Sequence, residues 1–177
     1  MYSVDGKDRV IRITDIPQSS VGAPNPIVLS DELVTVVDFY LQNTPPGWDG
    51  TWVRVVSADT EDEPVALVRF SLCYASILGP PNDEAFAGHP LAGCGLTPYG
   101  AFLIENSSWI RQLERMNSVH RYHRPERFET LKHYILTFHD STFECVADRY
   151  RIEMHEGSAR SAISRMADLL SHDANPT

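Results

Sequence analysis

HYILTFHDSTFECVA, residues 133–147, is the stretch that shows most clearly how this chain folds. Its two halves, residues 133–139 and 142–147, are rich in the aromatic and β-branched residues that favour strands. The polar pair Asp140-Ser141 lies between them, and a two-residue connection between two strand-like runs is a strong hairpin signal. The sequence therefore predicts an antiparallel hairpin here.

The predicted turn at Asp140-Ser141 determines which residues of the two strands face each other. It places His133 opposite Asp148 and Thr137 opposite Glu144. One face of the hairpin then carries side chains suited to a core: Tyr134, Leu136, Phe138, Phe143, Cys145 and Ala147. The other face mixes polar and apolar side chains: His133, Ile135, Thr137, His139, Glu144, Val146 and Asp148. A site can form on this mixed face, because a carboxylate opposite His133 would orient its imidazole.

Patterns on both sides of the hairpin predict an α+β fold. Strand-like runs occupy residues 8–16, 27–29, 33–41, 52–57 and 65–74. The last two are expected to pair as a hairpin across an acidic turn. Residues 33–41 also fit helical spacing, but their β-branched and aromatic residues favour a strand. Amphipathic helices are expected at about residues 107–119 and 158–171, so we predict a mostly antiparallel sheet or sandwich with two helices.

Length and composition fit a single domain spanning residues 1–177, with residues 172–177 as a disordered tail. The chain contains 42% hydrophobic and 22% charged residues, close to ordinary globular usage. Its net charge of −9 repels nucleic acid and anionic membranes, so neither is expected as a partner. Three widely spaced cysteines, with no apolar run of membrane-spanning length, favour a cytoplasmic protein with reduced thiols.

The segment GPPNDEAFAGHPLAGCGLTPYG, residues 79–100, is crowded with glycine and proline and has no sustained period. A loop of this length without regular structure is often functional in a compact domain. It carries four polar side chains that can contribute to a site: Asn82, Asp83, Glu84 and His89. If the loop folds over the mixed face of the hairpin, we expect His89 to meet His133.

Two sets of residues are therefore the candidates for function. The catalytic candidates are His89, His133, Glu144 and Asp148, with a histidine as acid or base and a carboxylate that orients it. The ligand-binding candidates are Asn82, Asp83, Glu84 and His139. The same residues also fit ordinary cross-strand pairs on a solvated sheet and ordinary turns. The seven histidines match no zinc signature, so no metal ligand and no cofactor is assigned.

The sequence contains no Gly-rich phosphate loop, dinucleotide fingerprint, G-x-S-x-G or H-E-x-x-H motif. Our leading hypothesis is therefore a domain that binds a small molecule or another protein, as a homo-oligomer if the C-terminal helix packs on a partner subunit. The alternative is a small hydrolase, lyase or isomerase with a His/carboxylate site, with or without a metal. Convergence of those groups in a pocket would favour the enzyme.

Four segments, GPPNDE, GHPL, NSSWI and HYILTFHDSTFEC, resemble segments of a group of uncharacterised bacterial proteins. The resemblance covers about residues 65–150 and includes most of the candidate site residues. It implies no activity, cofactor or fold, so it assigns no catalytic role to any residue of this chain.

Overall fold

The described part of the chain forms two antiparallel sheets and a few helices. The structure is a computed structural model that describes residues 2–44, 47–52 and 54–171. The first sheet has the order β1 (Arg9–Ile13), β6 (Gly100–Glu105), β7 (Lys132–Thr137), β8 (Thr142–Ala147), β5 (Ala75–Gly79). The second sheet has the order β2 (Ile27–Ser30), β3 (Val34–Tyr40), β4 (Glu63–Ser71), β9 (Arg149–Gly157). The helices are α1 (Ser108–Asn117), α2 (Glu126–Glu129) and α3 (Ala159–Ser171), with short 3-10 turns at Phe86–Gly88 and Ala92–Cys94.

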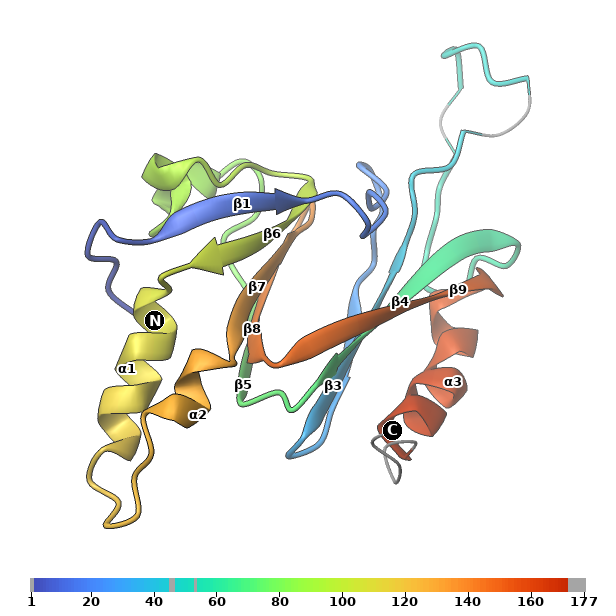
Figure 1. Cartoon of the computed structure of the whole chain (residues 1–177). Helices are drawn as coiled ribbons and strands as arrows, with labels where there is room; N and C mark the ends of the chain where they lie inside the picture. The colour runs from blue at the N-terminus through green and yellow to red at the C-terminus, as the bar shows by residue number, and fades with distance from the viewer. Residues whose placement is uncertain (1, 45–46, 53, 172–177) are drawn as a thin grey trace.

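A bent two-stranded ribbon joins the two sheets at one corner. Strand β4 continues into β5, and β8 continues into β9, so both strands pass from one sheet to the other (Figure 1). At the corner, residues 72–74 lie opposite residues 147–148, which makes a bulge, and Leu72 has a φ of 49°. Backbone hydrogen bonds from Tyr74 to Val146 and from Asp148 to Ser71 keep the ribbon paired through the bend. Bulged strands that change sheets are a common way to build such corners.

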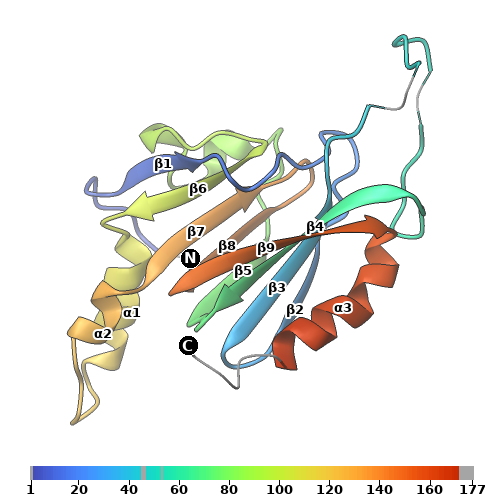
Figure 2. The same ribbon diagram turned by 45° about the vertical axis from the view of Figure 1, so that its right-hand side comes forward.

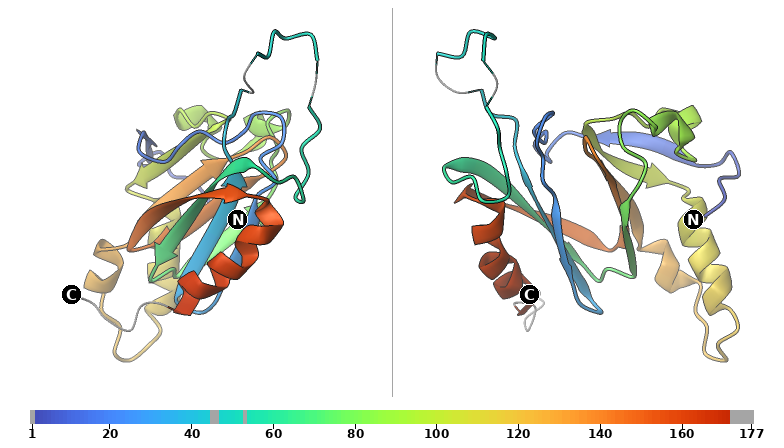
Figure 3. Two further views of the ribbon diagram at one scale, coloured as in Figure 1. Left: turned by 90° about the vertical axis from the view of Figure 1, so that its right-hand side faces the viewer. Right: turned by 180° about the vertical axis from the view of Figure 1, so that it is seen from behind.

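The main core lies between the two sheets, and each sheet has a covered outer face. Helix α3 packs on the outer face of the second sheet, as two views of the molecule show (Figures 2 and 3). The outer face of the first sheet is covered by α1, the N-terminal segment and residues 80–99, which we call the covering loop. The side chains between the sheets include Val37, Phe39, Phe70, Leu136, Phe138 and Phe143.

The α+β antiparallel sandwich predicted from the sequence is confirmed. The two amphipathic helices are α1 and α3. Ser107 caps α1 by accepting a hydrogen bond from the Ile110 amide. Residues 33–41 contain strand β3, whose residues Val34–Tyr40 are all buried. Burial on both faces removes the alternation of apolar and polar residues, which is why the spacing alone was ambiguous.

Several predicted elements are wrong or incomplete. The described residues of 52–57 form no strand, so the predicted hairpin with residues 65–74 is absent and β4 pairs with β3 and β9 instead. Strands β5, β6 and β9 were not predicted. The predicted tail, residues 172–177, lies outside the described residues. No helix in the described part of the chain is long and apolar enough to cross a membrane.

The hairpin of residues 133–147 is confirmed, but its turn lies one residue earlier than predicted. The Phe138 amide donates to the Ser141 carbonyl at 2.9 Å, so His139 and Asp140 form the turn. His133 therefore faces Val146, Ile135 faces Glu144 and Thr137 faces Thr142. The two threonine hydroxyls donate to carbonyl groups of the covering loop, Thr137 to Thr97 and Thr142 to Pro81, and such tertiary contacts help to select the register. Each residue therefore faces a partner two positions away from the predicted one, and the paired side chains of Lys132–Thr137 and Thr142–Ala147 stay on their predicted faces.

Candidate functional site

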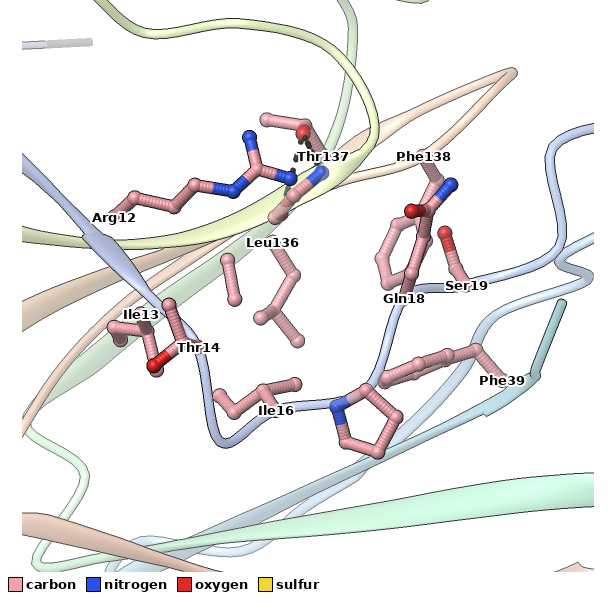
Figure 4. A pocket seen from close by; sticks show the side chains of 13 residues that line it. Arg12, Ile13, Thr14, Ile16, Gln18, Ser19, Phe39, Leu136, Thr137 and Phe138 are labelled. Atoms are coloured by element: carbon pink, nitrogen blue, oxygen red, sulfur yellow. Dashed lines mark hydrogen bonds between the residues drawn. The ribbon is translucent and has the colours of Figure 1, made fainter.

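A hollow among the described residues lies between the two sheets, beside the segment that follows β1. This intersheet cavity has a volume of about 230 Å³ and is lined by the segment after β1, the start of β6, the end of β7 and Phe39 of β3. Figure 4 shows Ile16, Leu136 and Phe39 pointing toward the same space. Its apolar lining comprises Ile13, Ile16, Pro17, Phe39, Ala101, Leu136 and Phe138.

Polar groups line the remainder of the intersheet cavity. Four polar side chains from the segment Arg12–Ser19 contribute: Arg12, Thr14, Gln18 and Ser19. Thr137 adds a hydroxyl that is already bonded to the backbone of Gly100. An apolar hollow with a few polar groups is the usual composition of a small-molecule site.

Arg12 is the only cationic side chain that lines this cavity among the described residues. Its Nη2 donates to the Tyr99 carbonyl oxygen at 3.2 Å, and its guanidinium carbon lies 5.5 Å from the centre of the Phe102 ring. Gly100 makes room for this arrangement, because a Cβ there would come within 2.9 Å of the Phe102 ring and 3.2 Å of the Arg12 guanidinium. A larger residue at position 100 would therefore clash with Phe102 and crowd the Arg12 guanidinium.

A second polar cluster lies on the outer face of the first sheet, around Glu144. The two carboxylate oxygens of Glu144 contact His89 Nε2 at 3.2 Å, His133 Nε2 at 3.0 Å and the Tyr2 hydroxyl at 2.7 Å. The Ser107 hydroxyl lies 2.9 Å from His133 Nδ1. We call these five residues the glutamate network. They come from the N-terminal segment, the covering loop, the start of α1 and the hairpin.

The hydrogen bonds of the glutamate network determine where its protons lie. His89 Nδ1 accepts from the Leu91 amide, so the ring hydrogen is on Nε2 and is donated to Glu144. Burial lowers the pKa of His133, which keeps this ring neutral. Burial alone would raise the pKa of Glu144, but hydrogen bonds from His133 and His89 outweigh it and hold the pKa at about 2. An ionised carboxylate is thus held by neutral donors.

The centre of the glutamate network is closed to solvent. His89, His133 and Glu144 are 3%, 0% and 4% exposed, and Tyr2 is 4% exposed. Each polar atom of the two imidazoles has a partner, as expected of a buried network that holds a structure together. The network therefore attaches the covering loop and the N-terminal segment to the first sheet.

A third cluster joins Asp83 of the covering loop to the tip of the hairpin. Asp83 Oδ2 accepts hydrogen bonds from the Tyr99 hydroxyl and from His139 Nδ1, the latter at 3.0 Å. The Asp83 amide also donates to the His139 carbonyl at 2.9 Å. The Tyr99 hydrogen bond lowers the pKa of Asp83 and raises that of Tyr99 to about 12. This cluster adjoins the intersheet cavity, because Tyr99 and His139 directly neighbour its lining residues in the chain.

The structure brings together most of the residues selected from the sequence. Of the catalytic candidates, His89, His133 and Glu144 meet, and the expected approach of His89 to His133 takes place through Glu144. The fourth candidate is wrong as a partner of His133: Asp148 lies at the corner between the sheets and pairs with Arg149 at 2.8 Å. The one-residue displacement of the turn explains this error.

The ligand-binding candidates separate into two groups. Asp83 and His139 are in contact, as described above. Asn82 accepts a hydrogen bond from the Ala85 amide at 3.0 Å, which is the role of an ordinary turn residue. Glu84 is exposed. No described group of three or more His, Cys, Asp or Glu side chains is arranged to hold a metal ion.

Four participating residues were missed by the sequence reasoning: Tyr2, Arg12, Tyr99 and Ser107. Ser107 is the cap of α1, and nothing in its local sequence indicates that His133 lies beside it. Tyr99 has a φ of 57°, which is unusual for a residue other than glycine, but such strain is visible only in the structure. A comparison with protein-family models found no match, and searches among curated proteins and among solved structures found none either.

Proposed function

We propose that this protein binds a small, largely apolar molecule that carries a carboxylate, in the intersheet cavity. The observation that carries the proposal is the cavity itself, whose described lining is mostly apolar and includes one cationic side chain, Arg12. A closed apolar cavity of about 150 Å³ is known to hold a benzene molecule. The volume of about 230 Å³ is therefore suited to a ligand the size of a substituted benzene ring or a short branched acid.

Arg12 supplies the preference for a negative charge. A guanidinium carries five N–H donors, and in the described structure one hydrogen bond from Arg12 goes to Tyr99. Its guanidinium lies over the Phe102 ring at the edge of the first sheet, so a carboxylate would bind at the rim of the cavity, where arginine can form two parallel hydrogen bonds with it. The net charge of −9 would repel an anion from the protein as a whole. The positive charge of Arg12 opposes that repulsion locally, at the cavity.

The proposal is tested by titrating the protein with benzoate and with the neutral analogue benzyl alcohol, followed by two-dimensional amide NMR. We expect benzoate to bind with a Kd of about 1 mM or tighter, a modest affinity that a ligand of this size can reach. We expect benzyl alcohol to bind more weakly. Arg12→Met should weaken benzoate binding by about 10-fold or more and leave benzyl alcohol nearly unaffected, because a charged hydrogen bond is lost.

Two matched controls separate the cavity from the rest of the surface. Ala101→Leu extends a side chain into the cavity and should abolish binding of both probes, whereas Ala87→Leu makes the same change at an exposed site and should not. Arg9→Met is the control for Arg12→Met. It removes a cation whose side chain is 69% exposed and which pairs with Glu105, and it should leave benzoate binding unchanged. Binding that survives Ala101→Leu, or no saturable binding of either probe, would contradict the proposal.

A further inference from the structure

Ser107 of the glutamate network occupies a sharp turn between a strand and a helix. Strand β6 ends at Glu105, Asn106 has a φ of 52°, and α1 begins at Ser108. This turn directs the Ser107 side chain toward the start of α1, where its Oγ accepts a hydrogen bond from the Ile110 amide at 3.3 Å. The serine hydroxyl therefore lies at the N-terminus of α1, where the Asp8 carboxylate also accepts a hydrogen bond, from the Ser108 amide at 2.6 Å.

Ser107, His133 and Glu144 form a linear relay. His133 Nε2 carries a hydrogen that it donates to Glu144 at 3.0 Å, so its Nδ1 is an acceptor and the Ser107 hydroxyl donates to it at 2.9 Å. A serine, a neutral histidine and a carboxylate in this order are the components of the hydrolase triad. The two ring nitrogens are exchanged relative to the serine proteases, but the roles depend on the proton positions rather than on which nitrogen faces the serine.

Ser107 is also the member of the network that lines an open groove. The groove has a volume of about 560 Å³ and lies between the end of β6, α1 and residues 128–132. Its apolar lining is formed by Leu103, Ile104, Ile110, Phe128 and Leu131. Ser107 itself is 3% exposed, and this groove is the hollow whose lining includes it.

We infer that Ser107, His133 and Glu144 form a second site, which cleaves small carboxylic esters with an apolar acyl group. Ser107 Oγ attacks the ester carbonyl carbon while its proton moves to His133 Nδ1, and Glu144 stabilises the resulting imidazolium. The carbon–oxygen bond to the alcohol then breaks, and the alcohol leaves with the proton from Nδ1. Water attacks the acyl-serine by the same route and releases the acid and free Ser107.

The remaining members of the network have supporting roles. Tyr2 and His89 donate to the oxygens of Glu144 and hold the carboxylate in place, so they are positioning residues. This site lies on the outer face of the first sheet, whereas the intersheet cavity lies on its inner face. The two proposals are therefore independent of each other.

The test is covalent labelling of the full chain with a fluorophosphonate probe, with mass spectrometry to find the modified residue. We expect one label on Ser107, and hydrolysis of p-nitrophenyl butyrate with an initial burst from the acyl-enzyme. Ser107→Asn keeps a residue that can cap α1 and should lose both the label and the hydrolysis. His133→Gln should slow both reactions by about 100-fold or more, the usual contribution of a general base.

Two measurements distinguish this site from a purely structural cap. Ser118→Ala changes a serine at the other end of α1 and should leave labelling unchanged. The labelling rate of the unmodified protein should fall at low pH as His133 becomes protonated, a dependence that a structural serine would not show. Absence of any label, a label on another residue, or full hydrolysis by folded Ser107→Asn would overturn the inference.

Discussion

Asp38 is a buried acid whose environment disfavours its charge. It lies in the middle of β3 and is 0% exposed. Its Oδ1 accepts a hydrogen bond from the Ile27 amide at 2.8 Å, while Oδ2 has no hydrogen-bond partner among the described residues. Burial raises its pKa to about 7 and outweighs the opposing effect of the Ile27 hydrogen bond.

This raised pKa predicts that the protein loses stability as the pH rises. Protonated Asp38 favours the folded state, and this contribution is complete below the ordinary pKa of 3.8 and lost as the pH rises through about 7. Asp38→Asn cannot ionise. Relative to this variant, the unmodified protein should lose up to about 4 kcal/mol of unfolding free energy between pH 4 and pH 8, about 1.4 kcal/mol per pKa unit.

Urea unfolding of both proteins across this pH range measures the effect. Asp140→Asn is the matched control, because the Asp140 side chain is 82% exposed. Equal pH dependence of the Asp38→Asn variant and the unmodified protein would show that Asp38 ionises freely in the folded state.

Glu144 predicts the opposite dependence on pH. Its pKa is lowered to about 2, so its contribution to stability is present above its ordinary pKa of 4.5 and is lost as the pH falls through about 2. Glu144→Gln turns an amide NH₂ toward groups that are themselves donors. We expect this variant to lose about 3 kcal/mol at pH 7 in chemical denaturation, as when a buried pair is broken.

The deficit of Glu144→Gln should shrink near pH 2, where the unmodified glutamate is also protonated. Glu105→Gln removes a carboxylate that is 46% exposed and should cost less than about 1 kcal/mol, as for other surface pairs. A Glu144→Gln variant as stable as the Glu105→Gln control at pH 7 would mean that the network contributes little to folding.

At the scale of single residues, the sequence indicated part of the sites. His89, His133 and Glu144 were selected because their residue types and the hairpin pattern placed them near one another. Tyr2 lies 142 positions from Glu144 in the chain, and Arg12 lies 87 positions from Tyr99. No local pattern records contacts at such separations, so these residues could not be predicted.

The covering loop is attached to the first sheet in part by one side chain, His89. Regular structure within it is limited to two 3-10 turns, and His89 connects it to Glu144 and to the Leu91 amide. His89→Ala should therefore release the loop locally while the sheets remain folded. Hydrogen exchange should show faster exchange at Leu91 and neighbouring amides, with unchanged protection in β7 and β8. Unchanged protection at Leu91 would show that apolar contacts alone hold the loop.

Elements were predictable where one stretch of sequence carries its own signal. Helix α1 has a serine cap and a regular apolar stripe, and the β7–β8 hairpin has two strand-like runs with a short connection. Strands β5 and β9 carry no such signal, because β5 contains exposed Ile77 and Leu78 and β9 contains exposed Met154. Strand β5 pairs with β8, and β9 pairs with β4, so each is stabilised by a strand that is distant in the sequence rather than by a local pattern.

At the scale of the whole molecule, the bent ribbon explains why a cavity exists. The sheets are connected at one corner by β4–β5 and β8–β9, where strands pass from one sheet into the other (Figure 3). The segment after β1 crosses from the first sheet toward the second and partly fills the space between them. The fold class followed from the order of elements in the sequence, but the cavity did not, because it depends on the angle between the sheets.

The measurement that tests the cavity proposal most directly is a crystal structure of the protein soaked with 4-bromobenzoate, recorded at the bromine absorption edge. We predict one strong anomalous peak between Ile16, Phe39 and Leu136, with the carboxylate beside the Arg12 guanidinium. The peak should be absent from crystals of Ala101→Leu. A cavity that contains only water in the soaked crystal, or a bromine peak found elsewhere on the surface, would contradict the proposal that this cavity is a ligand site.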